Sequence, residues 1–155
     1  MHGVERLVDV RTAPGSRRMP HFSRASLELT LPERGIEYAH MPELGGRRKA
    51  LPDSVNAGWR NDSFRGYSDY MQTEDFWRAI DQLRVHATAK STAIMCAEAV
   101  PWRCHRSLIA DALTVQGVAV RHVTGRGEPA IHRLTAFASV LDGRITYPGT
   151  DTLPL

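Results

Sequence analysis

Residues 94–106 read IMCAEAVPWRCHR. The apolar start of this stretch predicts a buried strand that ends near Cys96 and Glu98, and the residues from Cys104 onward predict a helix. In open α/β sheets, ligands bind where the carboxyl ends of strands meet the amino ends of helices. Both cysteines of the chain lie in this junction, with a carboxylate, an imidazole and two guanidiniums. The stretch therefore predicts an α/β fold and the place of its site.

Strands and helices alternate outward from this junction. The hydrophobic pattern and the capping residues predict strands at 7–10, 36–40, 91–96, 118–123 and 144–147, and helices at 23–31, 73–87, 104–116 and 134–141. Ser23 and Thr73 are the expected helix N-caps, while Gly35 and Gly117 are expected to end helices. The alternation predicts a single domain over residues 1–155, with three layers (α/β/α) and a mostly parallel sheet.

Residues 42–72 form a long polar segment rich in Gly, Asn, Asp and Arg, with no sustained periodicity beyond a short turn near 67–71. Irregular segments of this length in compact domains are usually lids or binding loops, and the aromatic residues of the segment argue against disorder. Its alternating arginines and aromatic residues could stack on a nucleotide or a single strand. In the other interpretation the aromatic rings pack on the sheet and the arginines stay solvated.

Composition excludes some classes of protein. The 155-residue chain carries a net charge of +3, and all but two of its 20 basic residues are arginine. Arginine favours binding of phosphate or carboxylate, although a GC-rich genome would produce the same bias. The chain has no run of about 18 apolar residues, so no membrane span is expected. Two cysteines in an otherwise unstapled chain indicate a reducing compartment, and we expect a cytoplasmic protein.

A first candidate site lies around Asp9, Arg11 and Ser16. Asp9 ends an apolar strand, where a carboxylate is costly unless it is paired or exposed in a cleft. Asp9 would be a catalytic or substrate-orienting group, and Arg11 and Ser16 would bind an anion. In the alternative, an ion pair between Asp9 and an arginine only holds the loop in place.

The junction itself is the second candidate. A helix that begins near Cys104 directs His105 toward the sheet, and Arg103 and Arg106 lie beside the free N–H groups of the first turn, where an anion would bind. Cys96 would be a nucleophile if its positive surroundings lower its pKa, and Glu98 a general acid or base. The alternatives are a buried apolar Cys96, a core His105, and a Glu98 that pairs with an arginine of the long segment.

Two further assignments concern a tyrosine and metal binding. From the long segment we assign Tyr67 to substrate binding. Cys96, Cys104 and His105 could supply three metal ligands, but their spacing is not that of a usual zinc site, and Cys104 is expected to face the core. We therefore assign neither a metal nor a cofactor.

Several motifs occur together along the chain. They are Asp9-Val10-Arg11 with Pro14 and Ser16, Leu44-Gly45-Gly46, Phe64-Arg65-Gly66-Tyr67, Met95-Cys96-Ala97-Glu98 and Cys104-His105-Arg106. In these motifs, from about Val4 to Gly149, the chain resembles the "domain of unknown function 488" proteins. The resemblance implies a soluble bacterial or archaeal α/β protein of unassigned activity. Members of that family usually begin with a further strand and helix, so we expect an exposed sheet edge and a homodimer.

These residues support one leading hypothesis and two alternatives. The leading hypothesis is an enzyme for a small anionic or nucleotide-like substrate, with Arg11, Arg103 and Arg106 on the anion and Asp9, Glu98 and His105 transferring protons. The first alternative is a nucleic-acid-binding or regulatory module that uses the long segment. The second is a truncated, inactive member of the family. The enzyme hypothesis requires the named side chains to line one pocket.

Overall fold

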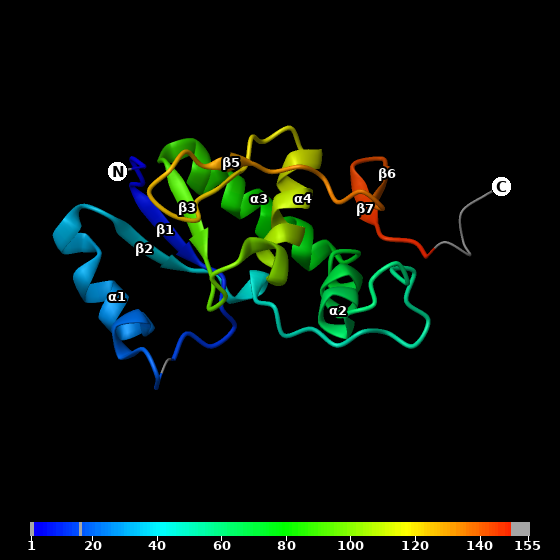
Figure 1. The fold of residues 1–155 in the computed structure, drawn as a ribbon, viewed down its shortest axis with the longest axis horizontal. Coiled ribbons are helices and arrows are strands. Elements are labelled where there is room, and N and C mark those ends of the chain that lie inside the picture. Colours follow the sequence, from blue (N-terminus) through cyan, green and yellow to red (C-terminus); the bar gives the residue numbers. More distant parts are fainter. Residues whose placement is uncertain (1, 16, 150–155) are drawn as a thin grey trace.

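A computed structural model describes residues 2–15 and 17–149, and its centre is a parallel sheet (Figure 1). The strands are β1 (Arg6–Asp9), β2 (Glu37–His40) and β3 (Thr92–Met95), in the order β2-β1-β3. Asp9 pairs with His40 on one side and with Met95 on the other. The carboxyl ends of the three strands therefore lie at one edge of the sheet.

Four helices accompany this sheet in the described part of the chain: α1 (Arg24–Thr30), α2 (Asp62–Tyr70), α3 (Glu74–Ala89) and α4 (Arg106–Val115). Helices α3 and α4 lie side by side, while α1 lies at the β2 end of the sheet (Figure 1). The mixed α/β class is confirmed. The three-layer arrangement stays a prediction, because the main core cluster lies between the sheet and α3 and α4 and does not include α1.

Local chemistry places the helix ends where the sequence predicts them. The Ser23 side chain accepts a hydrogen bond from the Ser26 N–H at 3.2 Å, and the Thr73 hydroxyl accepts one from the Phe76 N–H at 3.3 Å. Gly35 and Gly117 adopt φ angles of 75° and 81°, the left-handed region that ends helices. In the described residues, four short 3-10 helices each begin with a proline: η1 (Pro20–Phe22), η2 (Pro32–Arg34), η3 (Pro42–Leu44) and η4 (Pro101–Arg103).

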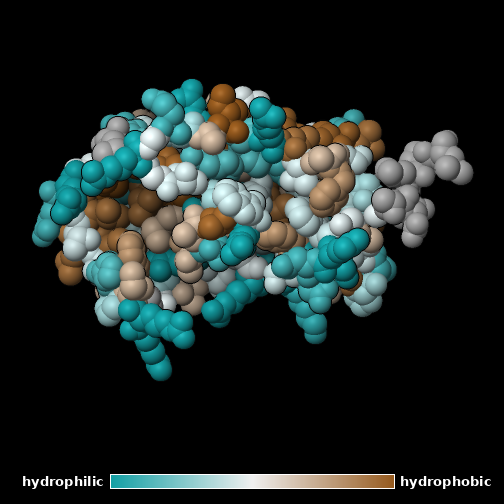
Figure 2. Space-filling model, in the orientation of Figure 1, coloured by the Kyte–Doolittle hydropathy of each residue, from teal (hydrophilic) through white to brown (hydrophobic). Residues whose placement is uncertain are grey.

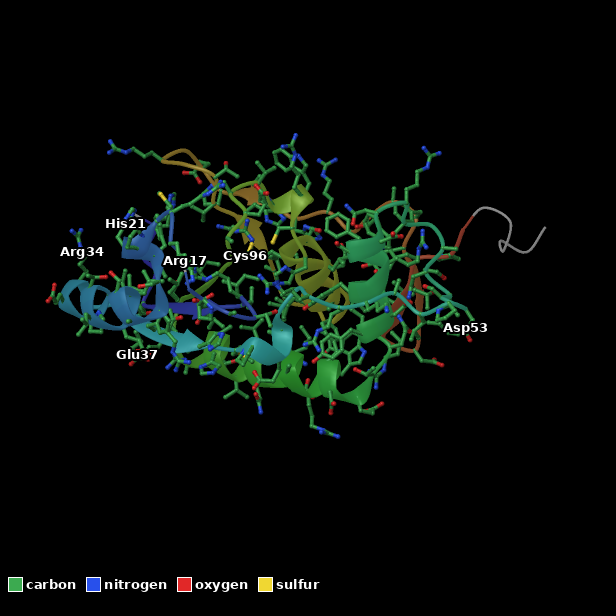
Figure 3. The ribbon with its side chains drawn as sticks, turned by 90° about the horizontal axis from the view of Figure 1, so that it is seen from below. Arg17, His21, Arg34, Glu37, Asp53 and Cys96 are labelled. Atoms are coloured by element: carbon green, nitrogen blue, oxygen red, sulfur yellow. The ribbon has the colours of Figure 1, made fainter. Side chains whose placement is uncertain are left out.

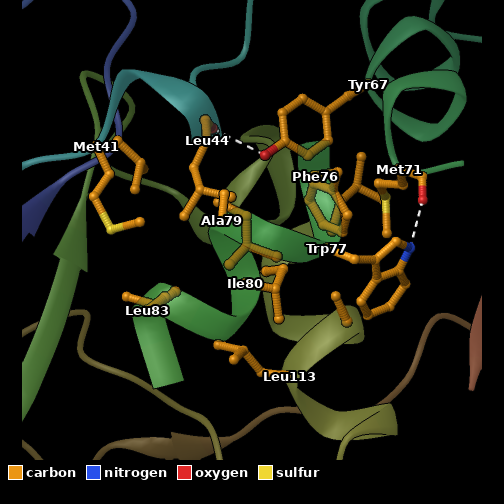
Figure 4. Packing of buried hydrophobic residues seen from close by; sticks show 14 of the residues in the cluster. Met41, Leu44, Tyr67, Met71, Phe76, Trp77, Ala79, Ile80, Leu83 and Leu113 are labelled. Atoms are coloured by element: carbon orange, nitrogen blue, oxygen red, sulfur yellow. Dashed lines mark hydrogen bonds between the residues drawn. The ribbon is translucent and has the colours of Figure 1, made fainter. Parts of the chain in front are cut away.

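Residues of β1, α2, α3, α4 and β7 (Arg144–Thr146) contribute to the core. Figure 4 shows Tyr67 and Trp77 within this packing, each with its polar atom bonded to a backbone carbonyl. The Tyr67 hydroxyl donates to the Leu44 carbonyl at 2.9 Å, and the Trp77 indole N–H donates to that of Met71 at 2.8 Å. These bonds let two large aromatic side chains be buried without an unpaired polar group.

The segment 42–72 is not the irregular loop that the sequence predicts. It contains η3 and the nine-residue helix α2, whose N-cap Asn61 accepts hydrogen bonds from the N–H groups of Ser63 and Phe64. Besides Tyr67, the buried residues of α2 are Gly66, Ser68 and Asp69, so the inward face is mostly small or polar. A search for apolar residues at helical spacing therefore misses this helix.

Two predictions for the region after α4 are wrong. Residues 118–123 do not extend the parallel sheet, because only β4 (Arg121–His122) is a strand there and it pairs antiparallel with β5 (Ala130–Ile131). Residues 134–141 are not a helix. They end in β6 (Ser139–Leu141), which forms a hairpin with β7 (Arg144–Thr146), so the strand expected at 144–147 is confirmed. The turn is Asp142-Gly143, and both residues have positive φ, as a two-residue hairpin turn requires.

One buried carboxylate anchors this C-terminal region to α4. Asp111 accepts hydrogen bonds from His132 Nε2, the Thr135 hydroxyl and the Tyr147 hydroxyl, each at 2.7 Å. His132 Nδ1 lies 2.7 Å from His122 Nε2, which extends the network to β4. The two histidines therefore link β4 to α4 through Asp111.

The molecular surface is mixed in character. On the face seen in Figure 2, apolar side chains gather around the β6–β7 hairpin, where Leu141 is 75% exposed.

Within residues 2–15 and 17–149, every helix is too short or too polar to span a bilayer.

Candidate active site

A pocket of about 720 Å³ opens at the edge of the sheet where the parallel strands end. Its walls are the loop after β1, residues 46–47, the start of α2 and the segment between β3 and α4. Cys96, labelled in Figure 3 with Arg17 and His21, lines this pocket together with Met19 and Phe22. The junction that the sequence singles out thus forms one wall of this pocket.

Most of the residues predicted for the site meet in this pocket. Those that line it are Arg11, Cys96, Glu98, Arg103 and His105. Asp9, Tyr67 and Arg106 lie outside its wall. Ser16 falls outside the described residues.

Asp9 lies behind the pocket wall and holds the Arg11 side chain, which lines the pocket. The Asp9 carboxylate is fully buried and accepts three hydrogen bonds from Arg11, from N at 3.1 Å, Nε at 2.8 Å and Nη2 at 2.7 Å. The Tyr38 hydroxyl donates a fourth at 2.5 Å. Burial raises the pKa of Asp9, but the hydrogen bonds from Arg11 and Tyr38 outweigh it and hold the pKa below its ordinary value. Asp9 therefore stays ionised and orients the Arg11 guanidinium.

Two thiols and an imidazole, which we call the cysteine–histidine cluster, lie at the floor of the pocket. Cys96 follows β3, whereas Cys104 and His105 precede α4, and one ligand atom from each lies within 4.8 Å of the other two. The hydrogen bonds from the Cys96 thiol and the Arg106 amide outweigh burial and lower the pKa of Cys104. The bond to Cys104, together with burial, raises the pKa of Cys96.

Of the two thiols, Cys104 is therefore the more acidic, whereas the sequence offers Cys96 as the possible nucleophile. Cys104 is buried, as expected, yet it also lines the pocket. The signal in the sequence is Arg106 two residues later, at the start of a helix. A positive charge and free N–H groups at such a place stabilise a thiolate.

His105 is held from three sides. Its Nε2 lies 3.2 Å from the Val10 carbonyl oxygen, which confirms that the imidazole leans toward the sheet. Its ring centroid lies 5.0 Å from that of Tyr67, and a Cβ on Gly46 would lie only 2.6 Å from Nδ1. Tyr67 itself is fully buried and does not line the pocket, so its assignment to substrate binding stays a prediction without support from this geometry. Its contact with His105 makes it a positioning residue.

Arg106 supports the wall of the pocket and does not form part of it. Its Nη2 donates to the Glu98 carbonyl, and its Nε lies 3.4 Å from Cys104 Sγ. The Glu98 carboxylate is exposed and accepts a hydrogen bond from the Val100 N–H at 3.3 Å. Glu98 and the exposed Arg103 thus face the pocket, while Arg106 holds their segment against α4.

The aromatic residues of segment 42–72 pack among themselves and on the C-terminal region. The Trp59 ring contacts those of Phe64, Phe137 and Tyr147, with centroids 4.7–5.2 Å apart. The guanidinium of Arg48 lies 3.6 Å from the centre of the Tyr70 ring. This arrangement agrees with the interpretation in which the segment packs its own rings, and it leaves few of them free to stack on bases.

Segment 42–72 also contributes four residues to the pocket that were not assigned to the site. Gly46 and Arg47 line it, as do Ser63 and Phe64 at the start of α2. Gly46 allows its backbone to approach the His105 ring, and Arg47 adds an exposed positive charge. The glycine pair followed by two arginines at 45–48 is the signal that points to Gly46 and Arg47.

Comparison with known proteins identifies the family of this chain. The family model described as "Domain of unknown function DUF488" matches residues 1–113. The matched part contains every residue that lines the pocket. No curated protein and no solved structure matches the chain.

Proposed function

Because the chain belongs to the DUF488 family, which is defined by a domain of unknown function, we propose its activity from the geometry of the pocket: it is an enzyme that acts on a small anionic or nucleotide-like substrate. One observation carries the proposal. Arg11, Glu98 and the cysteine–histidine cluster all line one pocket at the carboxyl ends of parallel strands. Open α/β proteins bind their ligands at this edge.

The arginines of the pocket favour an anion. Arg11, Arg47 and Arg103 line it, and a guanidinium can donate two parallel hydrogen bonds to a phosphate or a carboxylate. Asp9 fixes the guanidinium of Arg11 before a ligand arrives, which lowers the entropy that binding must overcome. A volume of about 720 Å³ lies within the range of small-molecule sites and is large enough for a nucleotide.

The other groups supply reactivity. Glu98 carries an exposed carboxylate at the pocket wall, and we assign it the proton transfer. The cysteine–histidine cluster is the reacting centre, in which Cys104 is the more acidic thiol. Asp9 and Tyr67 act through Arg11 and His105 as positioning residues, and Arg106 holds the loop. A cytoplasmic location and a homodimer remain predictions.

Binding can be tested first with inorganic phosphate and adenosine monophosphate, by calorimetry and by thermal shift. Arg103→Gln removes an exposed charge from the pocket, and Arg78→Gln is the matched control, since Arg78 is an exposed arginine of α3 outside the pocket. Loss of one charged hydrogen bond of about 1.5–3 kcal/mol weakens binding roughly tenfold or more. We expect this loss in Arg103→Gln and unchanged affinity in Arg78→Gln.

Turnover can be tested on a panel of phosphomonoesters, phosphodiesters, nucleotides and thioesters. Glu98→Gln should lower the turnover of the accepted substrate by roughly a hundredfold or more, with little change in its binding. If no anion binds and no member of the panel is turned over, the proposal is wrong. Equal affinity in Arg103→Gln and the wild type would remove the anion-binding role of the pocket.

A further inference from the structure

We propose that the cysteine–histidine cluster binds one zinc ion through Sγ of Cys96, Sγ of Cys104 and Nδ1 of His105, with the fourth coordination position open to the pocket. The use of that open position rests on the proposed function, because it requires a substrate in the pocket. The binding of the ion does not depend on it.

The distances suit a tetrahedral ion. Ligand atoms of the three residues lie within 4.8 Å of one another, and Cys104 Sγ lies 3.5 Å from His105 Nδ1. Zinc–sulfur bonds of about 2.3 Å and zinc–nitrogen bonds of about 2.0 Å place the ligand atoms roughly 3.5–3.8 Å apart. The sulfur–nitrogen pair already has this separation, and the others need a shift of about 1 Å at most.

The hydrogen bond at the far side of His105 prepares Nδ1 as a ligand. His105 Nε2 faces the Val10 carbonyl oxygen at 3.2 Å, and a carbonyl can only accept, so Nε2 carries the hydrogen. Nδ1 then has its lone pair directed toward Cys104. Zinc-bound histidines almost always donate their other N–H in this way.

Each sulfur also has a backbone donor. The Glu98 N–H donates to Cys96 Sγ at 3.3 Å, and the Arg106 N–H donates to Cys104 Sγ at 3.4 Å. In both cases the donor lies two residues after the cysteine. Such bonds stabilise the negative charge of a metal-bound thiolate and fix its direction. All three proposed ligands therefore have the supporting hydrogen bonds that a metal site needs.

The ligand set indicates zinc and an open site. Two sulfurs and an imidazole suit zinc, whereas magnesium and calcium prefer oxygen. Among the described residues, no further histidine, cysteine or carboxylate joins the group. Structural zinc sites have four protein ligands and catalytic sites three. Cys96, Cys104 and His105 all line the pocket with Glu98, so the free position faces the substrate space.

The unusual sequence spacing of the three proposed ligands is compatible with a zinc site in the folded chain. Seven residues separate Cys96 from Cys104, and Cys104 is adjacent to His105. Because Cys96 comes from a strand end and the other two residues from a helix start, the fold brings them together without a compact sequence motif.

The test measures zinc on the untagged full chain. After dialysis against zinc and then against buffer, the wild type should retain one zinc ion per chain by mass spectrometry of the metal. Cobalt in its place should give sulfur-to-cobalt charge-transfer absorption. Cys96→Ser, Cys104→Ser and His105→Gln should each weaken binding at least a hundredfold. His21→Gln, at an exposed histidine outside the group, is the matched control.

A second variant tests the geometry and changes no ligand. Gly46→Ala places a methyl group 2.6 Å from His105 Nδ1 and should weaken zinc binding about tenfold, as changes to groups that orient zinc ligands do. Circular dichroism shows whether each variant folds.

Three results overturn the proposal: no zinc in the folded wild type, zinc retained in folded His105→Gln, or a Cys96–Cys104 disulfide that forms without metal while added zinc does not bind. Inorganic phosphate binding is measured on the same samples. Phosphate binding without zinc binding overturns the zinc site and leaves the proposed function. Zinc binding without phosphate binding or turnover supports the zinc site and contradicts the proposed function.

Discussion

Replacing Asp9 with asparagine is expected to destabilise the protein by about 3 kcal/mol, because it removes one charge of a buried ion pair. The Asp9 carboxylate is fully buried, and the side chain of Arg11 is only 9% exposed. The amide has nearly the shape of the carboxylate, so the core packing stays the same. It can accept from Arg11 with one atom only, and its NH₂ group opposes a guanidinium N–H or the Tyr38 hydroxyl. The charge of Arg11 is then left without a counter-ion.

The size of the effect follows from this burial. Removing one partner of a buried pair costs about 3–5 kcal/mol, and the lower value applies because Arg11 reaches the wall of the pocket. Urea unfolding followed by circular dichroism measures it. With an m value of about 2 kcal/mol per molar, the midpoint should fall by about 1.5 M.

Glu28→Gln is the matched control. Glu28 pairs with Arg24 on the surface of α1, where both side chains are about half exposed, and the loss should stay near 0.5 kcal/mol. Equal midpoints for Asp9→Asn and Glu28→Gln would refute the reasoning. A large loss in both would show that any charge removal destabilises this chain.

Three further predictions concern pH, backbone contact and the C-terminal region. The pKa of Asp9 in the folded protein lies below its ordinary value, so ionised Asp9 adds to the free energy of unfolding. This contribution is complete above about pH 4 and is lost as the pH falls through the pKa of the folded state. The difference in free energy of unfolding between wild type and Asp9→Asn should therefore be constant from about pH 6 to 8 and shrink below pH 4. Gly66→Ala places a Cβ 2.2 Å from the Arg48 carbonyl and should cost about 3 kcal/mol in thermal unfolding, whereas Gly15→Ala, with open space around it, should stay within about 0.5 kcal/mol; similar losses would contradict the contact. Asp111→Asn removes the shared acceptor of His132, Thr135 and Tyr147 and should release residues 118–149 to limited proteolysis, and unchanged protection there would contradict its anchoring role.

The sequence alone predicts the elements whose signals are local. Ser23 and Thr73 cap their helices through bonds to residues three positions later, and Gly35 and Gly117 end helices because they adopt positive φ. Helix α2 could not be predicted this way, since tertiary contacts bury its small and polar residues. Asp69, for example, is buried because Ser54 and Asn56 donate to it from a distant part of the segment.

The same division holds for the site. Chain order and the strand-end rule were sufficient to predict that Arg11, Cys96, Glu98, Arg103 and His105 would meet, because parallel strands must end at one edge. The roles of other residues depend on neighbours far along the chain.

Only the tertiary structure decides that the buried Tyr67 hydroxyl donates to the Leu44 carbonyl, that Arg106 donates to the Glu98 carbonyl, and that Cys104 is the more acidic of the two thiols. A residue type determines which bonds a side chain can make. Which of those bonds it makes, and therefore its charge and its access to substrate, depends on the atoms that folding places within about 4 Å of it.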